Sequence, residues 1–293
     1  TTTTTTNDRS IMATHTQWIS LVAVIVMVVI AGLLVGTVVG TSENKKICRA
    51  LALGGGGDRG AYEAGVIHGL VSNLPPEQVK WDVVTGISAG ALNAIAIALY
   101  QRGDEKAASE FLISQWKTIT QKDVFKQWFP GGIAEGFLLK SGLLDTSPLR
   151  RYLGSIINST RIRNSGRKLH IGATSLTHNT FQTFDENDPD LLSAVLASSA
   201  IPDLFPVVNK GGETYVDGGA TYMTPITSSI RECLAMADEV HVDVVLAIAE
   251  AVNPDPDIGK KTTPFILGRT LMGIISNIHM KDIQNARQAF PNA

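Results

Sequence analysis

The pentapeptide Gly86-Ile-Ser-Ala-Gly90 constrains the fold of this chain more than any other stretch. It overlaps the end of Trp81–Ile87, an apolar run typical of a buried strand, and leads into Ala89–Tyr100, a small-residue run typical of a helix. A serine flanked by glycines on a strand-to-helix turn is the pattern of a nucleophile elbow, which lifts the hydroxyl above the end of a sheet. We therefore predict that Ser88 is a catalytic nucleophile.

A second glycine-rich turn, Leu53–Gly60 (LGGGGDRG), lies between the predicted strand Ile47–Leu53 and the predicted helix Ala61–Asn73. Bare amides at a helix N-terminus favour a phosphate or an oxyanion. The spacing also fits the GxGxxG pattern, so a dinucleotide-binding fold is an alternative. Such a fold uses an acidic residue at the end of its second strand, whereas this strand ends in Thr85-Gly86. The serine elbow therefore favours the oxyanion interpretation.

The best candidate for a general base is Asp217, in the segment Tyr215-Val-Asp-Gly-Gly219 directly after a short predicted strand. Glycines after the carboxylate allow it to face a neighbouring loop. None of the six histidines has a comparable local motif, although His178 and His279 stay open as bases. The sequence has no CxxC and no His/Cys cluster, so we predict neither a metal nor a cofactor. A formal net charge of −2 gives no indication of nucleic-acid binding.

Strand-like and helix-like segments alternate along the rest of the chain. The predicted strands are Ile47–Leu53, Trp81–Ile87, Lys168–Ala173, Thr180–Phe184, Thr214–Val216 and Val240–Ile248, and the predicted helices are Ala61–Asn73, Ala89–Tyr100, Asp190–Ser199, Pro225–Met236 and Phe265–Arg287. This alternation predicts an α/β fold, a three-layer sandwich with a mainly parallel central sheet. Residues 104–150 have an irregular helical pattern, and we expect them to cap the site.

Together these motifs resemble those of the patatin-like phospholipases. Gly55–Gly60 is similar to the family's GGGxRG stretch, the elbow surrounds Ser88, and Asp217–Gly219 is similar to its DGG turn. Further similarity lies in Gly142–Leu149 and Ser199–Pro206, so that the likeness runs from about residue 47 to 248. The resemblance implies a Ser88–Asp217 dyad in place of a triad, in which Asp217 takes the proton of Ser88.

The resemblance also implies roles for the surrounding residues. The amides of Gly55, Gly56 and Gly57 would form the oxyanion hole, while Arg59, Gly60, Gly86, Gly90, Gly218 and Gly219 would support the three motifs. The implied reaction is hydrolysis of fatty-acyl esters of phospholipids or lysophospholipids. Two alternatives stay open: a neutral-lipid (triacylglycerol) esterase, and a non-catalytic membrane-tethered module that binds phosphate or nucleotide.

A run of 23 residues without a charge, Trp18–Gly40, precedes this domain. At about 1.5 Å per residue it spans roughly 34 Å, enough to cross the hydrocarbon core of a bilayer. A buried core helix and a cleaved signal peptide are the alternatives, but the length and the weakly basic start favour a retained transmembrane helix. We predict a disordered segment at 1–17, a transmembrane helix at 18–40, a linker at 41–46 and the hydrolase domain at 47–293.

Further expectations depend on this membrane helix. Gly32, Gly36 and Gly40 form a small-residue stripe that predicts a homodimer contact. One basic residue precedes the helix and three follow it closely, which places the catalytic domain on the cytosolic side of a single-pass protein. The bilayer is thus the predicted partner and its phospholipid the predicted substrate. Because the chain begins without methionine, we also expect the sequence to be incomplete at one or both ends.

Two more patterns complete the predictions. Cys48 and Cys233 are far apart in the sequence and do not indicate a disulfide framework. Six basic residues occur between positions 150 and 168 with no acid among them, which predicts a surface for anionic lipid headgroups; they are Arg150, Arg151, Arg161, Arg163, Arg167 and Lys168. A solvated helix and loop is the alternative for this stretch.

Overall fold

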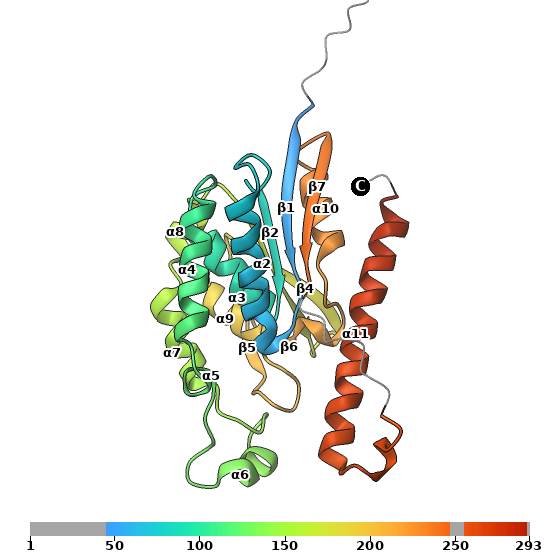
Figure 1. Ribbon diagram of the computed structural model, residues 1–293. Coiled ribbons are helices and arrows are strands. Elements are labelled where there is room, and N and C mark those ends of the chain that lie inside the picture. Colours follow the sequence, from blue (N-terminus) through green and yellow to red (C-terminus); the bar gives the residue numbers. More distant parts are fainter. Residues whose placement is uncertain (1–44, 247–254, 292–293) are drawn as a thin grey trace, which may run out of the picture. The chain divides into compact units, whose positions relative to one another are not determined.

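The computed structural model describes residues 45–246 and 255–291 (Figure 1). The strands are β1 (Ile47–Leu53), β2 (Val83–Ile87), β3 (Lys168–Ser175), β4 (Thr180–Asp185), β5 (Val208–Lys210), β6 (Glu213–Asp217) and β7 (Glu239–Val245). The α-helices are α2 (Gly60–Asn73), α3 (Ala89–Ala98), α4 (Glu105–Thr118), α5 (Gln121–Val124), α6 (Gly132–Leu139), α7 (Ser147–Ile156), α8 (Ser159–Arg163), α9 (Leu191–Ser198), α10 (Ile226–Leu234) and α11 (Thr263–Ala289). Short 3-10 turns are η1 (Gly57–Arg59), η2 (Gly218–Ala220) and η3 (Ile258–Lys260).

The strands form a single mixed sheet in the order β5-β6-β3-β2-β1-β7, with β4 paired to β3. Strands β7, β1, β2 and β3 are parallel, whereas β4 and β6 run antiparallel to β3 and β5 runs antiparallel to β6. The prediction of a mainly parallel sheet is therefore wrong for the β3 side. The physical reason is the length of the connections, because β3–β4 and β5–β6 are joined by tight turns that permit only antiparallel pairing.

Helices cover both faces of the sheet. Helices α3 and α9 lie on one face, with α2 and α4 packed beside them, and α10 lies on the other face with α11 outside it (Figure 1). Helix α3 is buried along most of its length, and its alanines allow it to lie close to β2. Its side chains join Trp81, Leu112 and Ile171 in the main core. The predicted α/β architecture with a central sheet and flanking helices is confirmed.

A disulfide joins Cys48 on β1 to Cys233 on α10, with 5.4 Å between the two Cα atoms. Both residues are buried. The two cysteines are 185 positions apart, so their spacing gave no indication of a bond. Packing of α10 directly on β1 brings them together, which the sequence did not indicate.

The predicted transmembrane helix at 18–40 lies outside the described residues, as do Gly32, Gly36 and Gly40 of the predicted dimer contact. Within 45–246 and 255–291, no helix combines the length and the apolar character that a membrane span requires. The predicted boundaries at 17, 40 and 46 therefore stay predictions.

Candidate active site

Strand β3 brings the two predicted catalytic residues together. Its Gly172 pairs with Ile87, the residue before Ser88, and the next residue of β3, Ala173, pairs with Asp217. Strand β6 thus continues along β3 from the point where β2 ends, so the turn after β2 meets the turn after β6. The Ser88 side chain and the Asp217 carboxylate interact at this meeting point, and the serine lowers the pKa of the carboxyl group.

Ser88 occupies a strained elbow between β2 and α3. Its φ of 56° and ψ of −123° lie outside the conformations that a non-glycine residue prefers. The backbone N–H of Ser88 donates to Ser198 Oγ at 2.9 Å. A Cβ at Gly86 would strike the backbone of Gly90, and a Cβ at Gly90 would strike the carbonyl groups at the end of β1. The elbow therefore requires glycine at both positions.

Asp217 ends β6 and caps the η2 turn. Its side chain is 4% exposed, and Oδ1 accepts the N–H of Gly219 at 2.8 Å. Burial raises the pKa of Asp217 to about 6, while the hydrogen bonds from Ser88 and Gly219 act in the opposite direction. At neutral pH most of the carboxylate is ionised, yet it retains enough basicity to accept a proton from a serine.

The glycine loop follows β1 and lies beside the elbow. A Cβ on Gly55 would come within 3.1 Å of Ser88 Cβ. The N–H of Gly55, however, already donates to the carbonyl of Met223 at 3.1 Å. The prediction of Gly55 as an oxyanion donor is therefore wrong in this structure, because the 223 segment passes alongside the loop and takes that amide. The backbone amides of Gly56 and Gly57 are then the predicted donors of the oxyanion hole.

Three further features shape the same loop. Gly57 has a φ of 61°, which suits glycine alone among common residues. The Gly56 carbonyl accepts the backbone N–H of Arg59 at 3.2 Å, so Arg59 closes the η1 turn through its main chain. Gly60 is packed against Trp116 and Ala89 and has no room for a Cβ. The end of the loop is thus packed against both α3 and α4.

A family model described as "Patatin-like phospholipase" matches residues 51–230, which include the glycine loop, the elbow and the Asp217 turn. This chain belongs to the patatin-like phospholipase family. It is thus a member of a family of lipid hydrolases, and the resemblance seen in the sequence is confirmed at this level.

Several known proteins are similar to this patatin-like chain. A cUMP-AMP-activated phospholipase of Escherichia coli is 26% identical over 230 residues, covering 74% of this chain and 68% of the relative. Uncharacterized NTE family proteins of Mycobacterium bovis and Mycobacterium tuberculosis are 28% identical over 205 residues, covering 70% of this chain and 49% of the relatives. The chain thus spans about half the length of the mycobacterial proteins. The crystal structure of VipD from Legionella pneumophila gives a TM-score of 0.33 at 15% identity over 59% of this chain and 46% of that one, too low to define the fold.

Helix α11 lies outside the segment that matches the patatin-like family, yet it contacts the glycine loop. Nε2 of His279 lies 3.1 Å from the Gly55 carbonyl, and Nδ1 lies 2.6 Å from Thr224 Oγ1. Since a carbonyl can only accept, Nε2 carries the hydrogen and Nδ1 accepts from the hydroxyl. Burial lowers the pKa of His279 to about 4, so the ring is neutral at pH 7. Both ring nitrogens are therefore occupied, and His279 does not serve as the base for Ser88.

One turn further along α11, Asp282 holds the segment after the Asp217 turn. It accepts the N–H groups of Met223 and Thr224 at 2.7 and 2.9 Å and is itself buried. Sequence reasoning missed Asp282 and Ser198. The one available signal for Asp282 is its position three residues after His279, which places both on one face of the predicted helix. His178, the other histidine left open, is exposed and pairs with Glu213 at 3.7 Å.

Polar groups also lie buried beneath the glycine loop. Asn93 Nδ2 donates to the Glu63 carboxylate at 2.8 Å and to the Gly60 carbonyl at 3.0 Å, and Asn93 Oδ1 accepts from the Trp116 ring at 2.7 Å. Burial raises the pKa of Glu63 to about 8, so the side chain is largely protonated at pH 7. Asn93 and Glu63 thus stabilise the first turn of α2, which follows the glycine loop.

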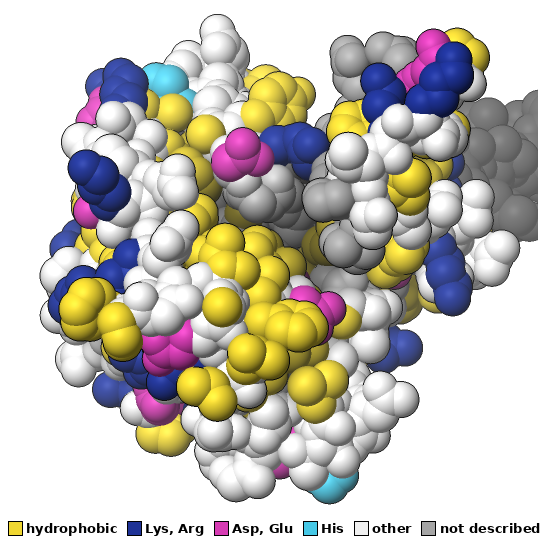
Figure 2. Space-filling view, turned by 90° about the horizontal axis from the view of Figure 1, so that it is seen from below, with side chains coloured by type: hydrophobic (Ala, Val, Ile, Leu, Met, Phe, Trp, Pro, Cys, Tyr) yellow, Lys and Arg dark blue, Asp and Glu magenta, His cyan; other side chains and the backbone are white. Residues whose placement is uncertain are grey.

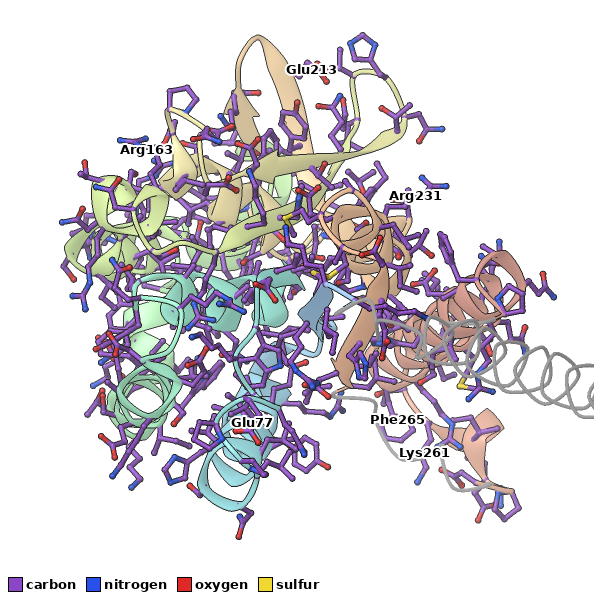
Figure 3. The ribbon with its side chains drawn as sticks, turned by 90° about the horizontal axis from the view of Figure 1, so that it is seen from above. Glu77, Arg163, Glu213, Arg231, Lys261 and Phe265 are labelled. Atoms are coloured by element: carbon purple, nitrogen blue, oxygen red, sulfur yellow. A yellow bond between two sulfur atoms is a disulfide. The ribbon has the colours of Figure 1, made fainter. Side chains whose placement is uncertain are left out.

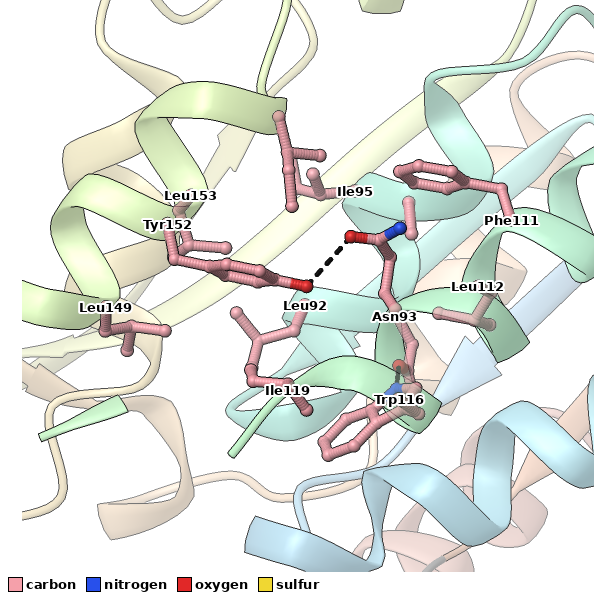
Figure 4. Close-up of a pocket in the computed structure, with 13 residues that line it drawn as sticks. Leu92, Asn93, Ile95, Phe111, Leu112, Trp116, Ile119, Leu149, Tyr152 and Leu153 are labelled. Atoms are coloured by element: carbon pink, nitrogen blue, oxygen red, sulfur yellow. Dashed lines mark hydrogen bonds between the residues drawn. The ribbon is translucent and has the colours of Figure 1, made fainter. Parts of the chain in front are cut away.

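A small apolar cavity adjoins Asn93 between α3, α4 and α7 (Figure 4). Its volume is about 50 Å³. A cavity of this kind needs about 10–15 Å³ to hold one water, so the space takes a few waters at most and no fatty-acyl chain. Tyr152 faces it with its hydroxyl bonded to Gln115 at 2.9 Å. The cavity in this form of the protein is therefore a packing gap beside the nucleophile helix.

The basic stretch between 150 and 168 does not form a single basic surface. Arg167 is buried in an ion pair with Glu105 at 2.9 Å, and its guanidinium also donates to three backbone carbonyls. Lys168 pairs with Glu186 at 2.9 Å. The prediction of six basic residues facing headgroups is thus wrong for Arg167, whereas the Lys168 side chain stays 43% exposed beside its carboxylate partner. Among the described residues, no group of three or more His, Cys, Asp or Glu side chains is arranged to hold a metal.

Proposed function

We propose that this protein is a serine acyl hydrolase that cleaves fatty-acyl esters of phospholipids or lysophospholipids through the Ser88–Asp217 dyad. The observation that supports it most is that adjacent positions of β3 bring Ser88, on its strained elbow, beside the buried Asp217 carboxylate. A nucleophile beside a base of adjusted pKa is the arrangement that acyl transfer needs. Membership of the patatin-like phospholipase family supports the lipid substrate.

The chemistry proceeds in two stages. Asp217 takes the proton of Ser88 as its oxygen attacks the ester carbonyl carbon, and the negative charge on the carbonyl oxygen is stabilised by the amides of Gly56 and Gly57. The tetrahedral intermediate collapses as Asp217 returns the proton to the leaving alcohol, which leaves the acyl group on Ser88. In the second stage Asp217 takes a proton from water as the water oxygen attacks the acyl carbonyl carbon. It returns that proton to the Ser88 oxygen as the acyl–Ser88 bond breaks and the fatty acid leaves.

An active-site probe tests this proposal directly. A fluorophosphonate should label the wild-type chain and fail to label Ser88→Ala, while Ser155→Ala, which removes an exposed serine of α7, should be labelled normally. Hydrolysis assays with mixed liposomes that also contain triacylglycerol then identify the substrate class. Labelling with release only from triacylglycerol would assign a neutral-lipid esterase. A chain that resists labelling while it binds phosphate or nucleotide would be the non-catalytic module.

We also propose that the domain is held at a membrane by the 18–40 segment. Two observations favour opposite sides of that membrane. The basic residues after the segment favour the cytosol, whereas the Cys48–Cys233 disulfide favours an oxidising compartment, since cytosolic thiols are kept reduced. Asn158 is an exposed residue of an Asn-Ser-Thr sequon. Its glycosylation would place the domain outside the cytosol, whereas an unmodified Asn158 together with alkylatable thiols would place it inside.

A further inference from the structure

The four most exposed of the large apolar side chains in the described residues lie on one hairpin. Residues 126–145, here termed the α6 hairpin, are closed at the neck by reciprocal backbone hydrogen bonds between Lys126 and Asp145 at 3.0 and 2.9 Å. The exposed side chains on its outer part are Phe129 (92%), Ile133 (53%), Phe137 (76%), Leu138 (73%) and Leu139 (77%). Soluble surfaces seldom expose so many large apolar groups together unless they meet a partner or a membrane.

The α6 hairpin lies at the catalytic end of the sheet. Helix α6 is found beyond the ends of β1 and β2, where the glycine loop and Ser88 follow (Figure 1). Viewed onto this end, hydrophobic side chains gather over the centre of the face (Figure 2). The base of the hairpin is bonded to the loop before β5, since Leu143 N–H donates to the Asp203 carbonyl at 3.0 Å. In the same loop, the Ala200 carbonyl accepts the N–H of Asp217 at 2.8 Å.

A second, smaller apolar group flanks the same end of the molecule. Phe265 and Ile266, in the first turn of α11, are 47% and 40% exposed. Lys261 lies over the Phe265 ring at 5.6 Å, and Figure 3 shows the two together, on the other side of the molecule from Arg163. The basic stretch around Arg163 and this apolar group are therefore separate surfaces.

The charges around the hairpin suit a lipid surface. Each of its two carboxylates is paired with a lysine, Glu135 with Lys140 and Asp145 with Lys126, both at 3.4 Å. Lys140 also lies 5.0 Å from the Trp128 ring. An apolar tip with aromatic residues and lysines at its edge is the composition of elements that enter the headgroup region of a bilayer.

We propose that the α6 hairpin inserts its apolar tip into the surface of a phospholipid bilayer and so directs the Ser88 end of the sheet to the lipid. The assignment of Ser88 as the group that meets this lipid rests on the proposed function. A bilayer fits the hairpin better than a protein partner does. Apolar side chains that are more than half exposed need a matching pocket in a protein but none in a fluid membrane.

The test compares one enzyme on two substrates. The full chain is reconstituted into vesicles, so that the 18–40 segment tethers every variant alike, and is assayed on vesicle phospholipid and on a water-soluble short-chain ester. Leu138→Ser/Leu139→Ser should lower phospholipid hydrolysis at least ~tenfold while soluble-ester hydrolysis stays within about twofold. The matched control, Leu74→Ser/Leu234→Ser, changes two exposed leucines at the opposite end of the sheet and should leave both rates within about twofold.

Other outcomes would overturn the proposal. An equal loss on both substrates would mean that the hairpin shapes the site itself, and no loss on either would remove the membrane role. A shift from dimer to monomer in detergent, with unchanged phospholipid hydrolysis, would assign the tip to a second copy of the chain.

If the wild type hydrolyses neither substrate, the proposed function fails, and membrane insertion of the hairpin is then measured by fluorescence. Brominated phospholipids should then quench the fluorescence contributed by Trp128, defined by difference from Trp128→Phe, and absence of quenching would refute insertion.

Discussion

The strand-end turns and helix α11 both form contacts around the glycine loop, and they differ in what they contribute to the site. The turns after β1, β2 and β6 lie inside the segment that matches the family and carry the proposed reacting groups, Ser88 and Asp217. Helix α11 lies outside that segment and contributes no reacting group. It supplies instead two buried polar side chains, His279 and Asp282, that bond to the loop and to the segment beside it.

The strand-end turns thus carry the reacting groups, whereas α11 positions the loop around them. Each strand-end turn has a local reason for its shape, such as the glycines that surround Ser88. The distance between the turns has no local cause. Met223 illustrates this, because its carbonyl accepts from Gly55 while its own N–H donates to Asp282. A helix about sixty residues away from Met223 thus helps to set the position of the predicted oxyanion loop.

Removal of the proposed base should have the largest effect. Asp217→Asn should lower kcat on a short-chain ester by about 10³-fold, since an amide cannot take the proton of Ser88. The same variant should melt at a higher temperature at pH 8, because burial of an ionised carboxylate is relieved. Activity near that of the wild type would place the base elsewhere and end the assignment of chemistry to the strand-end turns.

The pH profile gives the next largest effect. Because the pKa of Asp217 is raised to about 6 and the ionised form is the base, kcat/KM should rise about tenfold per pH unit up to pH 6 and level off above it. His279, with its pKa lowered to about 4, cannot produce an inflection near 6. A profile that is flat between pH 4.5 and 8 would contradict the role of Asp217.

Removal of the α11 contact should have a smaller effect. His279→Ala should lower kcat about tenfold with little change in KM, because the Gly55 carbonyl loses its partner while the reacting groups stay. The inflection near pH 6 should not move, and His279→Gln, which retains a donor, should recover part of the rate. His178→Ala is the matched control and should behave like the wild type, since that ring is exposed. A loss as large as that of Asp217→Asn would make His279 part of the chemistry.

The smallest effect on activity is expected for Glu63→Gln, which changes the support beneath the glycine loop. The pKa of Glu63 is raised to about 8 from 4.5, so the stability it contributes is fully present below pH 4.5 and is lost as the pH rises through 8. Between these values, wild-type stability should fall relative to the Gln variant by roughly 1.4 kcal/mol per pH unit. Denaturant melts at pH 5, 6.5 and 8 measure this, and parallel curves for the two proteins would show that Glu63 is ionised in the fold.

Much of the site was predictable because its chemistry depends on short turns. Ser88, Asp217 and the glycine loop each follow a strand within a few residues, and glycine requirements are visible in the letters themselves. The positions of most strands and helices followed from apolar periodicity, which is likewise a local property of the sequence. The direction of β4 and β6 was harder, because a tight turn and a crossover both follow a similar apolar strand. Strand β5 was not predicted, since its three residues (VNK) have no apolar pattern.

What the sequence determined alone is therefore local: a strand-end serine, a carboxylate on a glycine turn, a loop of bare amides, and a long uncharged segment before the domain. Tertiary structure decided how these meet. Adjacent positions of β3 bring Ser88 and Asp217 together, Met223 takes the amide of Gly55, and Cys48 meets Cys233 only because α10 packs on β1. Such contacts join residues tens to hundreds of positions apart, and their cause is the packing of whole elements against each other, which no local pattern records.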